Sequence, residues 1–268
     1  MTSDAGKERD TSSSKEFYEY YAAQSESALA LDRSRHIYEV VSSVYLRGGQ
    51  SRRLEVLDVG CNAGTQSLVW AEQGHDVFGL DINASLVELA ASRAKARGLT
   101  VDFQVGTAER IPLPDQSRDV CLAPELLEHV PDWESCINEL DRVLRPGGVL
   151  FLTTTNILCP VQQEFELPLY SWYPAPLKRH FERLSVTTRP ELVNHARYPA
   201  VHWFSFFQFR TLLQPRGYNC LDRFDTKAMQ RNDLPKQLVL RAIQRLPPLR
   251  WLAHVLTPYT YLVAVKVR

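Results

Sequence analysis

An apolar run that ends in a glycine turn spans residues 56–64, with the sequence Val-Leu-Asp-Val-Gly-Cys-Asn-Ala-Gly. The largely apolar segment 55–59 is typical of a strand buried on both faces of a parallel sheet. A strand that leads through a glycine turn into a helix brings backbone N–H groups close to a charged ligand. This run therefore predicts an α/β sheet with a ligand site beside the turn.

Strand and helix signals alternate along the rest of the chain. Strands are predicted at 76–80, 101–105, 119–123, 149–155, 218–225 and 259–267, and helices at 67–73, 84–97, 133–144 and 203–213. Two further helices, near 17–21 and 32–46, come before the first strand. The alternation predicts a Rossmann-like, doubly wound, mostly parallel sheet of seven strands, with helices on both faces and ligands at the carboxyl ends of the strands.

The domain organisation is expected to be simple. The 268 residues, of which 44% are hydrophobic, can bury one sizeable core. We predict a disordered polar leader over residues 1–14 and a single domain over 15–268. Residues 156–200 are rich in proline and aromatic residues and interrupt the alternation, so we expect a loop-like cap insertion there. Residues 235–257 are expected to form a second insertion, which is helical and basic-amphipathic.

Composition excludes several classes of protein. The chain has 31 basic and 31 acidic residues, which argues against a nucleic-acid binder, because such proteins usually carry a basic surplus. Its five scattered cysteines contain no C-x-x-C pair and fit reduced thiols better than disulfides or a zinc site. No secretory signal opens the chain and no apolar run approaches the ~20 residues of a membrane span. We therefore expect a cytoplasmic protein, with peripheral membrane contact left open.

The glycine spacing distinguishes between two nucleotide ligands. A dinucleotide pyrophosphate prefers G-x-G-x-x-G, whose middle glycine allows close approach of the phosphates. Here Gly60 and Gly64 are present and that middle glycine is missing. Asp58 puts a carboxylate at the strand tip, which would repel pyrophosphate but suits the ammonium group of a methionine. These features favour S-adenosylmethionine over NAD.

Polar residues follow the next two predicted strands. Asp81 ends the second strand, where an acidic side chain can accept both ribose hydroxyls. Ala108 and Glu109 follow the third strand, where the adenine edge would lie. A structural reading stays open, in which Asp58 and Asp81 only cap helices.

Five motifs occur together in a characteristic order. They are Asp58-Val-Gly-Cys-Asn-Ala-Gly64, Gly79-Leu-Asp81, Ala108-Glu-Arg-Ile-Pro-Leu-Pro-Asp115, Glu125-Leu-Leu-Glu-His-Val130 and Leu144-Arg-Pro-Gly-Gly148. Through these motifs the chain resembles the class I S-adenosylmethionine-dependent methyltransferases, most of all the small-molecule branch that includes the ubiquinone- and menaquinone-biosynthesis enzymes. The resemblance covers about residues 55–155.

The resemblance implies a set of cofactor-binding residues. They would surround the methionine part, then the ribose, the adenine and the sulfonium side. The chain departs from the family in one respect, because its turn lacks additional glycines that relatives often carry. Around the methionine part these residues are Asp58, Gly60, Cys61 and Gly64; beside the ribose, Asp81 with the adjacent Ile82; beside the adenine, Ala108 and Glu109; and on the sulfonium side, Pro124.

A cluster of ionisable residues follows the fourth predicted strand. Glu125 and Glu128 are expected on one face of a helical turn, with His129 beside them. Two carboxylates and an imidazole could hold Mg²⁺ or Zn²⁺ and lower the pKa of a substrate hydroxyl. The same string also occurs in relatives without a metal, where it orients the turn, so we assign no metal ligand.

Two histidines are candidate catalytic bases. O-methylation needs the hydroxyl proton to be removed, and a neutral imidazole suits that step near pH 7. His129 lies at the carboxyl end of the fourth strand, and His202 precedes the helix that leads to the sixth strand. His202 could equally cap or pack that helix.

The predicted function is SN2 transfer of a methyl group to an oxygen of a small or lipid-linked molecule, such as a quinone, glycan or natural product. Methylation of carbon or nitrogen, an NAD-dependent oxidoreductase and a catalytically silent binding protein stay open as alternatives. The basic amphipathic segment 235–257, which includes Trp251, could rest on an anionic membrane or pack as an ordinary surface helix. The sequence gives no indication of the oligomeric state.

Overall fold

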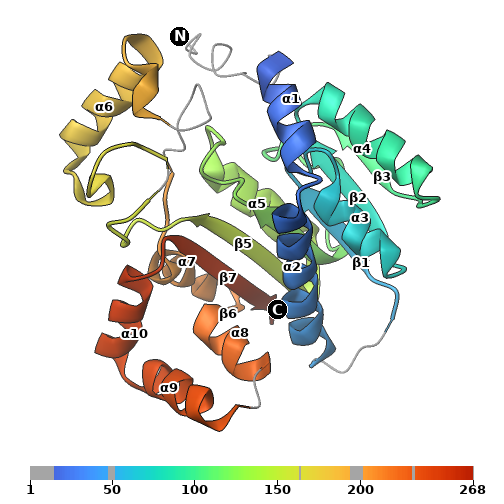
Figure 1. Ribbon diagram of the computed structural model, residues 1–268. Helices are drawn as coiled ribbons and strands as arrows, with labels where there is room; N and C mark the ends of the chain where they lie inside the picture. Colours follow the sequence, from blue (N-terminus) through green and yellow to red (C-terminus); the bar gives the residue numbers. More distant parts are fainter. Residues whose placement is uncertain (1–14, 48–51, 163, 194–201, 231–232, 268) are drawn as a thin grey trace.

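The computed structural model describes residues 15–47, 52–162, 164–193, 202–230 and 233–267. The leader predicted for residues 1–14 lies outside this part of the chain. A seven-stranded sheet with the order β3-β2-β1-β4-β5-β7-β6 forms the centre of the molecule (Figure 1). The strands are β1 (Glu55–Val59), β2 (Asp76–Asp81), β3 (Asp102–Val105), β4 (Arg118–Pro124), β5 (Leu144–Thr155), β6 (Tyr218–Leu221) and β7 (Tyr259–Lys266).

The sheet is mostly parallel, as predicted. The neighbours from β3 to β5 pair in parallel, while β7 runs antiparallel to both β5 and β6. The strand order reverses between β1 and β4, because the chain first adds strands on one side of β1 and then on the other. In open α/β sheets, ligands bind at the carboxyl ends of the strands beside such a switch point. The glycine turn after β1 lies there.

Helices cover both faces of the sheet (Figure 1). One core cluster joins α5 and α7 to the sheet, and a second joins α2 and α3 to the opposite face. On β4, Cys121 belongs to the first cluster and Leu122 to the second, so both faces of this strand are buried. The helices are α1 (Lys15–Gln24), α2 (Ala28–Leu46), α3 (Thr65–Glu72), α4 (Ala84–Ala96), α5 (Trp133–Val143), α6 (Ala175–Thr187), α7 (Phe206–Leu213), α8 (Arg223–Gln230), α9 (Leu234–Arg245) and α10 (Pro247–Val255).

The predicted strand 218–225 is too long. The strand ends at Leu221, because the side chain of Asp222 accepts hydrogen bonds from the first turn of α8, which begins at Arg223. Oδ1 of Asp222 accepts hydrogen bonds from the backbone N–H groups of Phe224 at 2.8 Å and Asp225 at 2.9 Å. The helix predicted from residue 203 also begins later, at Phe206, because Ser205 forms a capping box with Gln208.

The first predicted insertion contains more regular structure than the sequence indicated, whereas the second is helical, as predicted. The stretch expected to be loop-like contains α6, which stands apart from the sheet (Figure 1). The segment 235–257 forms two helices, α9 and α10, which meet at Leu246 and Pro247. All five cysteines are unpaired and buried. Among the described residues, no helix is both long and apolar enough to span a membrane.

Candidate active site

Backbone hydrogen bonds, within the turn and to β2, hold the glycine turn between β1 and α3. Gly60 and Gly64 have φ angles of +72° and +81°, in the left-handed region that glycine enters at little cost. The N–H groups of Gly60 and Cys61 both donate to the carbonyl of Leu80, at 2.8 and 3.1 Å. The N–H of Gly64 donates to the carbonyl of Cys61 at 2.9 Å. Because these N–H groups have partners inside the protein, the turn offers few of them to a pyrophosphate.

Asp58 combines one paired and one unpaired carboxylate oxygen. The Ser67 hydroxyl donates to Oδ2 at 2.5 Å, whereas Oδ1 is buried and has no hydrogen-bond partner within the described residues. Burial raises the pKa of the Asp58 carboxyl to about 7, against the opposing effect of the Ser67 hydrogen bond. An ammonium group would stabilise this buried carboxylate, and a phosphate would repel it. The site therefore fits the methionine part of S-adenosylmethionine.

Asp81 supports the same turn from the end of β2. Its Oδ2 accepts the N–H of Asn62 at 2.8 Å, and its Oδ1 accepts the N–H of Asn83 at 2.8 Å. The side chain that caps α4 is that of Asn83, not that of Asp81. Each carboxylate oxygen retains a second lone pair that a ribose hydroxyl could use. Ile82 is 57% exposed and offers apolar surface beside this carboxylate.

The remaining predicted cofactor residues follow β3 and β4. Ala108 is buried in the core, so it would meet an adenine ring mainly through its backbone. Glu109 is half-buried. Pro124 is the last residue of β4 and lies opposite Thr153 of β5. All the predicted cofactor residues lie at or just beyond the carboxyl ends of β1 to β4, and their individual roles stay predictions.

The segment after β4 that carries Glu125, Glu128 and His129 forms an irregular turn, whereas we expected one turn of helix there. Glu128 is buried, and its Oε2 accepts the hydroxyl of Thr154 at 2.8 Å and the N–H of Thr155 at 2.7 Å. This carboxylate therefore fastens the turn to the end of β5. Nε2 of His129 lies 3.7 Å from Oε1 of Glu128, and the His129 side chain is 41% exposed.

Glu125 has a different partner, which the sequence did not indicate. Its Oε2 pairs with Arg33 of α2 at 2.9 Å, and its backbone has a φ of +51°. The two carboxylates that we considered as possible metal ligands thus have different partners. Across the described ranges, no group of three or more His, Cys, Asp or Glu side chains is arranged to hold a metal ion.

Glu164 is a second residue that sequence reasoning missed. It lies in the stretch after β5, where no periodic pattern marks individual positions. The hydroxyl of Thr155 donates to its Oε1 at 3.5 Å. Burial, together with the nearby carboxylates of Glu128 and Glu125, raises the pKa of Glu164 to about 7. A carboxyl with this pKa can accept a proton near neutral pH.

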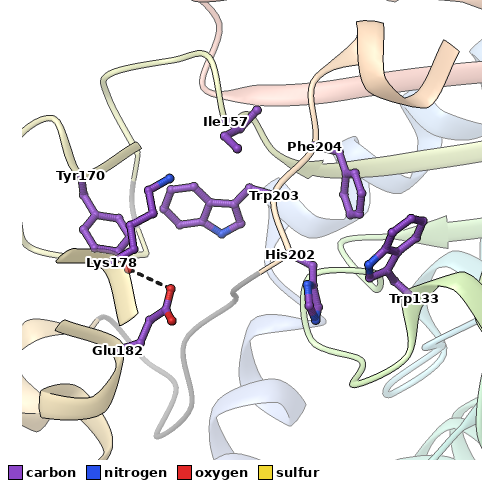
Figure 2. Close-up of a pocket in the computed structure, with 8 residues that line it drawn as sticks. All are labelled: Trp133, Ile157, Tyr170, Lys178, Glu182, His202, Trp203 and Phe204. Carbon is purple, nitrogen blue, oxygen red and sulfur yellow. Dashed lines mark hydrogen bonds between the residues drawn. The ribbon is translucent and has the colours of Figure 1, made fainter. Parts of the chain in front are cut away.

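An aromatic pocket lies beside the carboxyl end of β5, near Ile157 (Figure 2). Its cavity volume is about 170 Å³. Figure 2 shows Lys178 next to Tyr170 and Trp203 on one side, and His202, Trp133 and Phe204 on the other. The hydroxyl of Thr154, the next-to-last residue of β5, lies 3.4 Å from the carbonyl oxygen of His202. The lining residues are Trp133, Ile157, Tyr170, Lys178, Glu182, His202, Trp203 and Phe204.

Polar contacts fix the cap side of this pocket. The Tyr170 hydroxyl donates to Oε1 of Glu182 at 3.2 Å, and Nζ of Lys178 donates to the carbonyl of Ser171 at 2.8 Å. The same Nζ lies 5.8 and 5.6 Å from the ring centroids of Tyr170 and Trp203, within the range of cation–π attraction. Burial lowers the pKa of Lys178. Of the two histidines that we predicted as candidate bases, His202 lines this pocket and His129 does not.

Comparisons with known proteins agree with this arrangement. The family described as "Methyltransferase domain" matches residues 57–152. The ubiquinone biosynthesis O-methyltransferases of Histophilus somni and Rhizobium etli are 41% identical over 107 residues and 37% identical over 103 residues. Each match covers 38% of this chain and 45% or 42% of the relative. The chain therefore matches less than half the length of these relatives.

A solved structure extends the comparison to most of the chain. The S-adenosylmethionine-dependent methyltransferase of Methanosarcina mazei superimposes with a TM-score of 0.50 at 21% identity, covering 83% of this chain and 96% of the other. At this identity the likeness concerns the fold. The match of residues 57–152 to the methyltransferase family and the sheet order agree with each other, so the chain contains a segment similar to a methyltransferase domain, on a fold that it shares with the Methanosarcina mazei protein.

Proposed function

We propose that the protein transfers a methyl group from S-adenosylmethionine to a hydroxyl oxygen of a small or lipid-linked molecule. The observation that carries this proposal is the aromatic pocket beside the carboxyl end of β5, two strands away from β1, which leads into the glycine turn. Apolar pockets with a few polar groups are typical of small-molecule sites. The names of the O-methyltransferase relatives also favour an oxygen acceptor.

The residues of the turn would hold and align the cofactor. Asp58 would accept the ammonium group through its unpaired Oδ1, and Asp81 would accept ribose hydroxyls. When bound, S-adenosylmethionine supplies a methyl group on a positively charged sulfur. The protein would contribute mainly by holding the acceptor oxygen in line with that methyl group, because alignment alone can lower a barrier by several kcal/mol, ~7 or more in favourable cases.

The acceptor would lie between aromatic rings of the pocket. Trp133, Tyr170, Trp203 and Phe204 favour a flat acceptor such as a phenol or catechol, since rings stack on one another with a preference of ~1 kcal/mol beyond area burial. His202 would remove the hydroxyl proton as the methyl group arrives. Excluding water from this small cavity would also prevent loss of the methyl group to solvent.

A second candidate is methylation of a carbon or nitrogen atom in the same pocket. The residues of the glycine turn would contact only the cofactor, so they do not indicate whether the methyl acceptor is an oxygen, nitrogen or carbon atom. An NAD-dependent oxidoreductase is disfavoured, because the N–H groups of Gly60, Cys61 and Gly64 have partners inside the protein and Asp58 carries an unpaired acceptor.

The experiment that tests the proposal has two steps. Calorimetry with S-adenosylmethionine and with NAD should give binding of the first only. The protein is then incubated with methyl-labelled cofactor and a set of phenols, catechols, anilines and enolisable quinols, and the labelled products are located by mass spectrometry. Label on a phenolic oxygen supports O-methylation. Label only on nitrogen or carbon would overturn the choice of acceptor atom, and tight NAD binding would overturn the proposal as a whole.

A further inference from the structure

The carboxyl-terminal part of the chain has a one-sided charge. Residues 234–268 contain six Lys or Arg residues and no Asp or Glu, although the whole chain is neutral. The first 233 residues therefore carry 25 basic and 31 acidic residues. On α9, Lys236 pairs with Asp233 at 2.8 Å, whereas Arg241 and Arg245 contribute exposed basic side chains.

The exposed face of α9 combines leucine and arginine. Leu234 and Leu238 are 74% and 65% exposed, and Arg241 and Arg245 are also exposed. These residues are spaced i, i+4, i+7 and i+11, so they share one stripe of the helix. Within the described residues, no ion pair is recorded for Arg241 or Arg245. Two apolar and two basic side chains thus project from one face of this helix.

The exposed face of α10 is apolar. Trp251 and Leu252 are 52% and 47% exposed, and Leu256, which follows the helix, is 71% exposed. Leu246, between the two helices, is 53% exposed. A water-facing surface rarely gathers side chains of this size, and such patches mark interaction sites. Figure 1 shows α9 and α10 at the edge of the molecule, away from β3 and α4.

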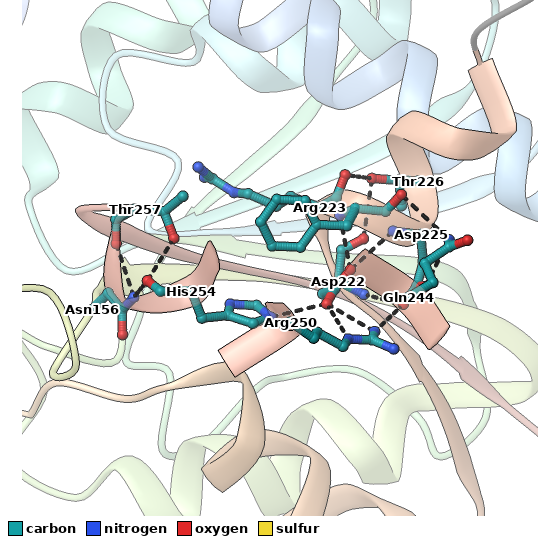
Figure 3. Close-up of polar contacts among 10 residues, drawn as sticks. Asn156, Asp222, Arg223, Asp225, Thr226, Gln244, Arg250, His254 and Thr257 are labelled. Carbon is teal, nitrogen blue, oxygen red and sulfur yellow. Dashed lines mark hydrogen bonds and ion pairs between the residues drawn. The ribbon is translucent and has the colours of Figure 1, made fainter. Parts of the chain in front are cut away.

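A buried polar network holds α10 in this orientation (Figure 3). Arg250 and His254 both contact Oδ2 of Asp222, at 2.8 and 2.9 Å, and Arg250 also pairs with Asp225 at 2.5 Å. The positive charge of Arg250 is therefore paired with two carboxylates within the protein. They also fix the buried side of α10, so that Trp251 and its apolar neighbours face outward.

The same helix is tied to the acceptor side of the sheet. Nδ2 of Asn156 donates to the carbonyls of His254 at 2.9 Å and Thr257 at 2.8 Å. Asn156 follows β5 directly, and the next residue, Ile157, lines the aromatic pocket. The end of α10 and one wall of the pocket are therefore joined through a single residue.

We propose that α9 and α10 form a docking surface for an anionic lipid bilayer. The large apolar side chains would enter the interfacial region, while Arg241 and Arg245 would contact acidic headgroups, in the manner of an amphipathic helix that lies on a membrane. Charge complementarity selects this occupant, because an acidic lipid surface matches a segment that has basic but no acidic residues. The proposal does not depend on the identity of the methyl acceptor.

The test uses the full chain and vesicles of defined composition. Flotation with phosphatidylcholine vesicles is compared with flotation after one third of the lipid is replaced by phosphatidylglycerol. We expect binding to the anionic vesicles and much weaker binding to the neutral ones, with a decrease at high salt. Arg241→Gln should lower the partition coefficient roughly fivefold, because one basic residue near the surface contributes about that factor. Leu238→Ser and Trp251→Ser should lower it as well.

Matched variants outside the surface serve as controls. Lys95→Gln on α4 removes the same charge, and Leu46→Ser at the end of α2 removes a leucine that is 51% exposed. Neither control should change the partition coefficient. Absence of binding to anionic vesicles by the unmodified chain would overturn the proposal. So would a soluble dimer that Leu238→Ser dissociates, if the chain does not float with vesicles, because a second copy would then cover this face.

Discussion

The Ser67 hydroxyl donates a hydrogen bond of 2.5 Å to Oδ2 of Asp58, and Oδ1 of the same carboxylate is left buried without a partner within the described residues. One oxygen therefore joins the tip of β1 to α3, while the other is available to a ligand. A buried acceptor without a partner lowers the stability of the protein. Cofactor binding would compensate for that loss, which is common at functional sites.

The first prediction concerns Asp58→Asn. The amide oxygen can still accept the Ser67 hydrogen bond, but the negative charge that faces the cofactor is lost. We expect S-adenosylmethionine affinity to fall about tenfold or more, as for loss of one charged hydrogen bond, measured by calorimetry at pH 8. Ser67→Ala is the matched control, since it removes the structural hydrogen bond and keeps the charge. An equal loss of affinity in both variants would assign Asp58 a purely structural role.

The second prediction concerns pH. Burial raises the pKa of the Asp58 carboxyl to about 7, and an ammonium ligand requires its ionised form. Affinity should therefore increase as the pH rises from 6 to 8, by up to roughly tenfold per unit below the pKa. In Asp58→Asn this dependence should disappear. A pH dependence that persists unchanged in the variant would show that another group is responsible.

The same raised pKa predicts a change in stability, which is the third prediction. A carboxyl whose pKa is higher in the folded than in the unfolded state binds more protons when folded. Its contribution is therefore favourable at low pH and is lost as the pH rises from about 4 to 7. Without cofactor, Asp58→Asn should gain stability at pH 8, by up to ~4 kcal/mol, and little at pH 4. Urea unfolding at both values measures this; equal effects at the two would contradict it.

The fourth prediction separates the two candidate histidines. His202 lines the aromatic pocket, whereas His129 is 41% exposed and lies near Glu128. With an acceptor identified by the product assay, His202→Ala should lower kcat about 100-fold, the usual effect of losing a general base, and change the cofactor Kd little. His129→Ala is the control and should retain most activity. The opposite result would transfer the role of base to His129.

Glu164 provides an independent check on that assignment. If Glu164 and not His202 accepts the proton, Glu164→Gln will abolish the rise of kcat near pH 7, because burial raises the pKa of this carboxyl to about 7. If His202 is the base, kcat will keep its pH dependence in Glu164→Gln and lose it in His202→Ala. A pH profile of kcat for the two variants therefore distinguishes the two bases.

The fifth prediction concerns Glu128, whose Oε2 accepts from both Thr154 and Thr155. Glu128→Ala would remove the acceptor of the buried Thr155 N–H and the nearer of two acceptors of the Thr154 hydroxyl, so we expect a loss of stability of roughly 1–3 kcal/mol in urea unfolding. Glu128→Gln preserves an oxygen acceptor at the same position and should lose much less. If both variants are as stable as the parent but inactive, Glu128 acts in catalysis and does not fasten the turn to β5.

Local patterns were sufficient for most of the sheet. The turn from Gly60 to Gly64 and the strands before and after it were predicted because an apolar run, a glycine turn and a helix are all local in sequence. Errors arose where a side chain ended an element. Asp222 starts α8 inside the predicted strand 218–225, and Ser205 delays the start of α7. A capping contact depends on backbone geometry that residue spacing alone does not reveal.

The sequence by itself indicated the resemblance to methyltransferases and predicted residues at the cofactor end of the sheet, since Asp58 and Asp81 stand beside predicted strand ends. Only the tertiary structure decided which residues surround the acceptor pocket and which surface is exposed on α9 and α10. Trp133 and Lys178 line one pocket from opposite sides, and Arg33 reaches Glu125 across 92 positions of the chain. Such contacts form between distant segments when the chain folds, so no local pattern in the sequence encodes them.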